Sequence, residues 1–365
     1  MIDKIHIKTR ENIVFNRIKI ICKKIWSSPY LRIVFSIALG VATLYLALKN
    51  ASLKEVGNAL RLVDYRYVIL ALLSVAINTI AKIFRWQVLI GVRGAFIKFR
   101  TLFMSLLAGQ MLNTLYPARV GDLSRAYVIG GLGPGRVFVL STVVLEKILD
   151  MLSYALLFIL LLLSIPLPNW VSESGYTLAG LAILVTLATF FLTYRQNLVI
   201  HLIERVLRWM PDRIKVYVFS KFQSALSSLE VFQGPSDLLR LAFWSAVIWA
   251  TALLNNHLTL LAFGIHLPLT ASLLILIGLQ AGISFTNIPG RFGIFEYICI
   301  LALALYGIEQ TTALSYGVLL HGIVMLPTTS LGLVFLPMLG TSGQRITLIP
   351  KRDTTFDLDQ SSNNG

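Results

Sequence analysis

Long apolar runs separated by short polar segments dominate the chain. The run YALLFILLLLSIPL, which starts at Tyr154, shows no alternation of apolar and polar positions, so it is typical of a membrane-spanning helix and not of a barrel strand. A helix needs about 20 mostly apolar residues to cross the roughly 30 Å hydrocarbon core of a bilayer. We predict six full spans, at about 31–48, 67–84, 137–165, 176–194, 238–262 and 312–339.

Two further apolar segments, 101–116 and 271–288, end abruptly at Pro117 and Pro289. Proline cannot continue a helix interior, and it pushes the preceding residue towards extended geometry. A shorter helix-like stretch follows each proline, at 120–132 and at 293–307. We therefore predict two re-entrant helical hairpins, each of which enters the membrane and returns to its own side.

The two breaks share the motif P-x-R-x-G, and Pro117 and Pro289 lie 172 residues apart. The same offset maps Arg85 onto His257. Paired Gly/Pro breaks at matching places in two membrane-embedded halves are the best sequence-level pointer to a transporter's binding site. The predicted fold is an all-α polytopic membrane protein whose halves, about 31–165 and 176–340, form an inverted repeat.

Composition agrees with a membrane protein: 56% of the 365 residues are hydrophobic, 13% are charged, and the mean hydropathy is +0.76. The net charge of +15 would suggest nucleic acid in a soluble protein. Here much of the excess lies in tails and loops, so we expect no nucleic-acid partner. Cys22 lies in a basic tail and Cys299 in an apolar helix, which indicates neither a disulfide nor a metal site.

The distribution of Lys and Arg predicts the orientation. The basic tail 1–30, the 85–100 loop and the 195–237 segment are assigned to the cytoplasm, and the 166–175 loop, which has no Lys or Arg, is assigned outside. The 49–66 loop also falls outside, although it carries four basic residues. On this count both termini are cytoplasmic and the two hairpins open from opposite sides of the cell (inner) membrane.

The predicted membrane domain comprises residues 31–340. A linker interrupts it and a polar tail follows it. The linker 197–232 contains an apolar stripe at Val199, Ile203, Val206 and Met210, which predicts an amphipathic helix at the membrane surface. The polar tail 341–365 is predicted to be disordered.

The first break is predicted to form an anion site. Two arginines lie beside the N-terminus of a new helix, where free N–H groups and the helix dipole favour negative charge, and guanidinium binds phosphate through two contacts. The alternative is an ordinary cytoplasmic loop whose arginines only enforce topology. The site residues predicted here are Asn113, Pro117, Arg119, Gly121, Asp122 and Arg125.

The second break carries a similar set of residues. Its glycines permit a tight turn and a close approach of the backbone to a ligand. A carboxylate on the first turn of the following helix either binds substrate or only caps that helix. The site residues predicted here are Gln280, Asn287, Pro289, Gly290, Arg291, Gly293 and Glu296.

Glu146 and Asp150 lie one turn apart in the third full span. Ionisable residues inside a membrane are functional candidates, and like charges at this spacing are unfavourable unless they are paired. Glu146 is therefore expected to bind substrate or to neutralise Arg119 or Arg125 across the hairpin, and Lys147 is expected on another face. We interpret His257 and His321 as buried hydrogen-bonding residues, and Lys82, Arg85 and Trp86 as a cytoplasmic end of a span that snorkels to the headgroups.

Together these residues resemble a known family. R-W-x-x-L at Arg85–Leu89, N-x-x-x-P-x-R-x-G-[DE]-x-x-R at Asn113–Arg125, the acidic third span and P-G-x-x-G-x-x-E at Pro289–Glu296 are similar to the flippase-like transmembrane region of lysylphosphatidylglycerol synthases. The resemblance covers about residues 30–340. Asp122 replaces the usual Glu, and Arg291 stands where the family commonly has Gly. The soluble aminoacyltransferase domain of the full synthases is not expected in this chain.

The resemblance implies movement of lipids with charged or sugar headgroups between leaflets. We therefore expect a flippase that binds an anionic phospholipid or a polyprenyl-phosphate-linked sugar, and we expect no catalytic residue, metal or cofactor. Two other functions remain open. One is a membrane enzyme for a lipid-linked substrate, with Glu146 or Asp150 as base. The other is a lipid-binding subunit that recruits a cytosolic lipid-modifying synthase.

Overall fold

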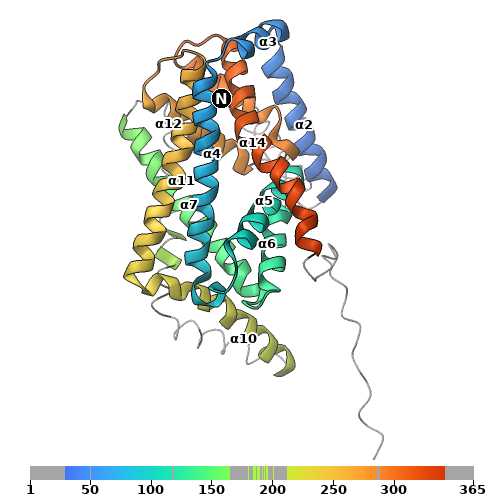
Figure 1. Cartoon of the computed structure of the whole chain (residues 1–365), viewed down its shortest axis with the longest axis vertical. Helices are drawn as coiled ribbons and strands as arrows, with labels where there is room; N and C mark the ends of the chain where they lie inside the picture. The colour runs from blue at the N-terminus through green and yellow to red at the C-terminus, as the bar shows by residue number, and fades with distance from the viewer. Residues whose placement is uncertain are drawn as a thin grey trace, which may run out of the picture.

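The structure, a computed structural model, is all-helical (Figure 1). It describes residues 29–49, 51–116, 119–164, 212–285 and 288–341, together with isolated positions between 180 and 200. The elements are α2 (Pro29–Leu48), α3 (Leu53–Arg61), α4 (Tyr65–Ile90), the 3₁₀ helix η1 (Gly91–Gly94), α5 (Phe99–Leu115), α6 (Val120–Gly130), α7 (Arg136–Ser164), α10 (Asp212–Leu226), η3 (Ser227–Gln233), α11 (Pro235–Ala262), α12 (Leu269–Phe285), η4 (Pro289–Arg291), α13 (Ile294–Ala304) and α14 (Gln310–Thr341).

Four helices of the described residues are long and apolar enough to cross a bilayer: Tyr65–Gly94, Arg136–Ser164, Pro235–Ala262 and Gln310–Leu339. They coincide with four of the predicted spans. The predicted span at 31–48 lies within the 20-residue helix α2, of which Ile37–Leu48 is a shorter apolar helix. The predicted span at 176–194 and the amphipathic stripe at 199–210 lie outside the described residues, apart from isolated positions.

Each predicted hairpin contains the two helices expected of it. α5 ends at Leu115 and α6 begins at Val120, while α12 ends at Phe285 and α13 begins at Ile294. Of the two prolines at the breaks, the structure describes Pro289, which is the first residue of η4. Pro117 lies outside the described residues.

The chain folds as two similar sets of helices. Adding 172 residues to α4, α5, α6 and α7 gives ranges that overlap α11, α12, α13 and α14. The packing repeats in the same way. α6 packs between α5 and α7 as α13 packs between α12 and α14, and α5 contacts α14 as α12 contacts α7. In Figure 1 α4 and α11 lie side by side and run in opposite directions, so the two sets point opposite ways.

The α4–α11 interface is the most extensive helix contact and is joined by polar side chains. Asn78 Nδ2 donates to the carbonyl oxygen of Ile248 at 2.6 Å and to Thr251 Oγ1 at 2.9 Å. About two turns further along the interface, Asn255 Nδ2 donates to the carbonyl oxygen of Ala71 at 3.1 Å. Hydrogen bonds of this kind fix the register of two helices in an environment without water.

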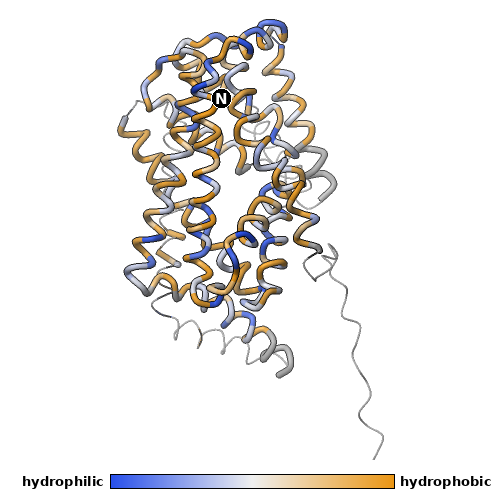
Figure 2. The backbone as a smooth tube through the Cα atoms, viewed as in Figure 1, coloured by the Kyte–Doolittle hydropathy of each residue, from blue (hydrophilic) through white to orange (hydrophobic). Residues whose placement is uncertain are grey.

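Apolar side chains cover the outer surface of the long helices. Figure 2 shows hydrophobic residues along the length of these helices, with hydrophilic residues at the two ends of the molecule and at scattered positions between them. Val41, Leu163 and Val334 are 62%, 82% and 56% exposed, and they belong to three different helices. So large an apolar surface is typical of contact with lipid, and the molecule is accordingly a multi-pass membrane protein.

Candidate functional site

A cavity of about 360 Å³ lies between the two sets of helices. Helices α4 to α7 and α11 to α14 all contribute to its lining, as does η4. Its walls are rich in amide and hydroxyl groups, and seven charged side chains face it: Lys82, Asp122, Arg125, Glu146, Lys147, Asp150 and Arg291. Charged groups in a membrane interior are costly to desolvate, so their concentration at one cavity makes it the candidate functional site.

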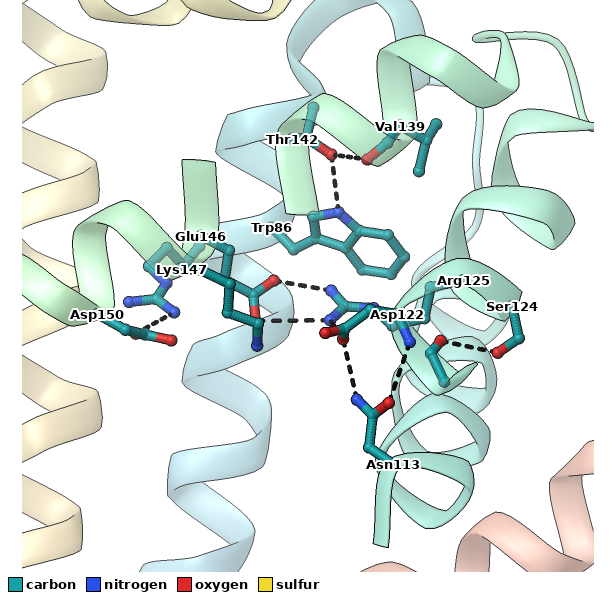
Figure 3. A network of polar contacts seen from close by, with 12 residues as sticks. Trp86, Asn113, Asp122, Ser124, Arg125, Val139, Thr142, Glu146, Lys147 and Asp150 are labelled. Atoms are coloured by element: carbon teal, nitrogen blue, oxygen red, sulfur yellow. Dashed lines mark hydrogen bonds and ion pairs between the residues drawn. The ribbon is translucent and has the colours of Figure 1, made fainter. Parts of the chain in front are cut away.

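Asn113 and Asp122 join the two helices of the first hairpin. Asn113 Nδ2 donates to Asp122 Oδ1 at 3.0 Å, and the backbone N–H of Asp122 donates to Asn113 Oδ1 at 3.3 Å (Figure 3). Gly121 lets the helices approach, because a Cβ at that position would clash with the carbonyl oxygen of Gly109. The side chains of Asn113 and Asp122 are thus held at the cavity wall.

Arg125 forms a two-point ion pair with Glu146. Its Nη2 lies 2.8 Å from Glu146 Oε2 and its Nη1 lies 3.5 Å from Oε1 (Figure 3). The guanidinium carbon also stacks 4.1 Å above the ring of Trp86, whose Nε1 donates to Thr142 Oγ1 at 3.2 Å. Of the two partners expected for Glu146, the structure therefore selects Arg125.

Arg85 is buried and does not snorkel, so that prediction was wrong. Its side chain is 1% exposed, its Nη2 lies 2.7 Å from Asp150 Oδ1, and its Nη1 donates to Ser245 Oγ at 3.3 Å. The physical reason is that α4 continues to Ile90, which keeps Arg85 inside the helix bundle instead of in a cytoplasmic loop. Asp150 is thereby paired as well.

Lys147 does not point to a separate face, contrary to the prediction. Its Nζ lies 3.7 Å from Glu146 Oε1, and its side chain is 40% exposed and lines the cavity. The long lysine side chain can turn back around the helix to the neighbouring carboxylate, a freedom that helix periodicity alone does not show.

Two cations of the cavity lining, Lys82 and Arg291, make no ion pair with a described residue. Lys82 comes from α4 in the first set of helices and Arg291 from η4 in the second set. The described carboxylates that form ion pairs in and around the cavity are those of Asp122, Glu146, Asp150 and Glu296, and their partners are other side chains. Lys82 and Arg291 are thus positive charges available to a ligand.

The arginines of the two breaks share an unusual backbone conformation, a positive φ angle. Arg119 has φ 53° and Arg291 has φ 60°, and they are the non-glycine residues with positive φ in the described part of the chain. This conformation costs a non-glycine residue about 1–2 kcal/mol, so its recurrence at equivalent positions supports the match between the breaks. Arg119 is exposed, does not line the cavity, and lies near enough to Arg291 for electrostatic repulsion.

At the second break, Glu296 caps α13 and also binds a histidine. Its Oε2 accepts the backbone N–H of Gly293 at 2.7 Å, and its Oε1 lies 2.7 Å from Nδ1 of His321. Gly293 has φ 86°, and a Cβ there would clash with α2 at the carbonyl oxygen of Gly40. Gln280 lines the cavity and Gly290 is buried with φ 67°, whereas Asn287 lies outside the described residues.

Lys82 and His321 line the cavity but were not among the predicted site residues. A signal for Lys82 was present, because Ser74, Asn78 and Lys82 follow each other at four-residue intervals and form a polar stripe along an apolar helix. All three line the cavity. His321 has no polar residue three or four positions away that could have distinguished it in the same way.

Comparisons with known proteins agree with the fold and the motifs. Residues 33–332 match the model of a family described as the lysylphosphatidylglycerol synthase TM region. A UPF0104 membrane protein of Methanothermobacter thermautotrophicus is 24% identical over 325 residues, which cover 84% of this chain and 95% of that protein. Because the family match covers most of the sequence, the chain belongs to the lysylphosphatidylglycerol synthase TM region family.

Proposed function

We propose that the protein moves an anionic lipid headgroup, that of a phospholipid or of a polyprenyl-phosphate-linked sugar, from one leaflet to the other. The observation that carries this proposal is the pair of cations, Lys82 and Arg291, which face one cavity from the two sets of helices without an ion-pair partner among the described residues. A phosphate bound there would neutralise both charges and would accept charge-assisted hydrogen bonds from them.

The arrangement of the two sets of helices supports transport. We propose that they form an inverted repeat across the membrane and that the α5–α6 and α12–α13 hairpins are re-entrant from opposite sides. Inverted repeats with broken helices at their interface allow a central site to open alternately to either side. The 172-residue offset between the breaks and the repeated helix packing are the support for this proposal.

An enzymatic role is less well supported, so we propose that the protein is not an enzyme. The candidate bases Glu146 and Asp150 form ion pairs of 2.8 and 2.7 Å with Arg125 and Arg85. In these pairs the guanidinium groups occupy lone pairs of the carboxylates that a base would need for a substrate proton. The role of a non-transporting lipid-binding subunit differs from transport in one measurable property, the exchange of lipid by the purified protein.

Fluorescent-lipid exchange in proteoliposomes tests the proposal. Vesicles with the purified protein should expose inner-leaflet phosphatidylglycerol or polyprenyl phosphate to an external quencher faster than empty vesicles do. Phosphatidylcholine with the same fluorophore serves as the control for non-specific leakage of lipid. Equal rates in protein-containing and empty vesicles with both anionic probes would reject transport and leave lipid binding without exchange.

The proposed topology predicts a labelling pattern. Leu62, between α3 and α4, is 84% exposed, and Val92 in η1 is 91% exposed at the opposite end of α4. In a background with Cys22→Ser and Cys299→Ser, Leu62→Cys should react with an impermeant thiol reagent added to intact cells. Val92→Cys should react only after the membrane is permeabilised, and the cysteine-free background shows the unspecific signal. The reverse pattern would contradict both the orientation and the cytoplasmic termini.

A further inference from the structure

The Glu296–His321 pair is a buried acid–base pair at the cavity. Both residues are 5% exposed, and the distance from His321 Nδ1 to Glu296 Oε1 is 2.7 Å. The second carboxylate oxygen accepts the N–H of Gly293 at 2.7 Å, so the same carboxylate holds the turn of the second break. Among the described residues this is the one buried ion pair that contains a histidine, since His257 binds Ser272 instead.

The imidazole is positioned to exchange a proton with the cavity. An ionised carboxylate only accepts hydrogen bonds, so Nδ1 of His321 carries the hydrogen that faces Glu296. Nε2 is then the nitrogen free to take up a proton, and His321 lines the cavity. Phe295 stacks on the ring at 4.4 Å between centroids and Phe292 lies at 5.2 Å, which fixes the orientation of the ring.

Other ionisable and charged groups lie around the pair. On the helices of the pair itself, Cys299 lies near Glu296, and Tyr316 is buried with its hydroxyl donating to the carbonyl oxygen of Asn256. The lining that α5, α11 and α12 contribute is uncharged. The remaining charged groups facing the same cavity are Arg291 from η4, Lys82 from α4, Asp122 and Arg125 from α6, and Glu146, Lys147 and Asp150 from α7.

The charge of the cavity links the proton to an anionic ligand. With His321 neutral, the lining and the residues paired to it hold five basic and four acidic side chains: Lys82, Arg85, Arg125, Lys147 and Arg291 against Asp122, Glu146, Asp150 and Glu296. Protonation of His321 adds one positive charge. A bound anion then favours the protonated imidazole, and by thermodynamic linkage the proton favours the anion to the same extent.

We infer that His321, held by Glu296, is the proton-binding site of a lipid–proton symport, in which one proton and one anionic headgroup cross together. The inference rests on the proposed lipid transport and adds its energy source. The proton enters from water in the cavity onto Nε2 and leaves by the same route, so no other bond is made or broken. A singly charged lipid and one proton carry no net charge, and the cycle is therefore driven by a pH gradient alone.

The test measures how a pH gradient distributes lipid between leaflets. Phosphatidylcholine proteoliposomes with a trace of fluorescent phosphatidylglycerol are given a gradient of about one pH unit, and an impermeant quencher reports the leaflet distribution. One-to-one coupling supports a ratio of about tenfold in favour of the leaflet that faces the alkaline side. His321→Gln should give a ratio near one. His257→Gln, at a partly buried histidine outside the cavity lining, should keep the wild-type ratio.

The outcomes separate this inference from the proposed function. If the wild type exchanges lipid but the leaflet ratio stays near one at every pH gradient, transport stands and the coupling is overturned. The coupling is also overturned if His321→Gln gives the same leaflet ratio as the wild type. Absence of any exchange by the wild type would overturn transport and the coupling with it. If His321→Gln does not fold, proton uptake by the weakly buffered wild-type protein on addition of phosphatidylglycerol decides, because coupling requires that binding of the anion is accompanied by binding of a proton. Absence of uptake would overturn the coupling.

Discussion

Arg125→Ala should unfold the first hairpin or strongly destabilise the whole protein. Arg125 and Glu146 are 3% and 6% exposed, and the substitution leaves the Glu146 carboxylate buried without its closest partner. Removal of one member of a buried ion pair costs about 3–5 kcal/mol. Lys147, 3.7 Å from Glu146, compensates in part, while the lost stacking of the guanidinium on Trp86 adds to the cost. The measurement is the thermal unfolding midpoint of the purified protein.

Two further variants isolate the ion pair as the cause. Arg240→Ala removes a pair of the same type, Arg240–Asp237 at 3.2 Å, whose side chains are 66% and 37% exposed. Exposed pairs contribute about 0–1 kcal/mol, so this control should unfold nearly as the wild type does. The double variant Arg125→Met/Glu146→Leu replaces the buried pair with apolar groups and should recover most of the stability. Equal unfolding midpoints for Arg125→Ala and Arg240→Ala would show that water reaches the pair.

The helices and breaks could be predicted because each depends on local sequence. Apolar runs set the long helices, and α5 ends two residues before Pro117, as expected from the missing N–H and the steric clash of proline in a helix. The rule is not absolute, because α14 continues through Pro327 and Pro337. The recurrence of P-x-R-x-G at a fixed offset then predicted a repeat, and the ranges of α4 to α7 and α11 to α14 follow that offset. The extension of α4 to Ile90 was missed because a basic residue after an apolar run was interpreted as the end of the span.

The pairing of charges could not be predicted, because it depends on how helices rotate against each other. Arg119 precedes α6 and Arg125 lies in its middle, and only the packing of α6 on α7 turns Arg125 towards Glu146. In the same way, Asp150 forms an ion pair with Arg85 because α4 packs on α7, although 65 positions separate the two residues in the chain. The spacing of residues within one helix predicts which side chains share a face of that helix. It does not predict which residue of the neighbouring helix forms an ion pair with them.

Lys82→Met should abolish most transport and leave the fold intact. The side chain makes no ion pair with a described residue, so the substitution orphans no described carboxylate, and methionine fills a similar volume on α4. A hydrogen bond to a charged group contributes about 1.5–3 kcal/mol. If Lys82 binds the phosphate of the lipid during the crossing, its removal should slow phosphatidylglycerol exchange by about tenfold to a hundredfold.

Matched variants show whether the effect belongs to the cavity. Lys98→Met removes an exposed lysine that does not line the cavity and should leave exchange unchanged. Lys82→Arg keeps the charge and should retain more exchange than Lys82→Met, although a planar guanidinium cannot occupy the space of a compact ammonium without a shift of the headgroup. Normal exchange by Lys82→Met, with an unfolding midpoint equal to that of the wild type, would remove Lys82 from the lipid path. Arg291 would then be the remaining cation of the described lining that forms no ion pair with a described carboxylate and is available to the headgroup.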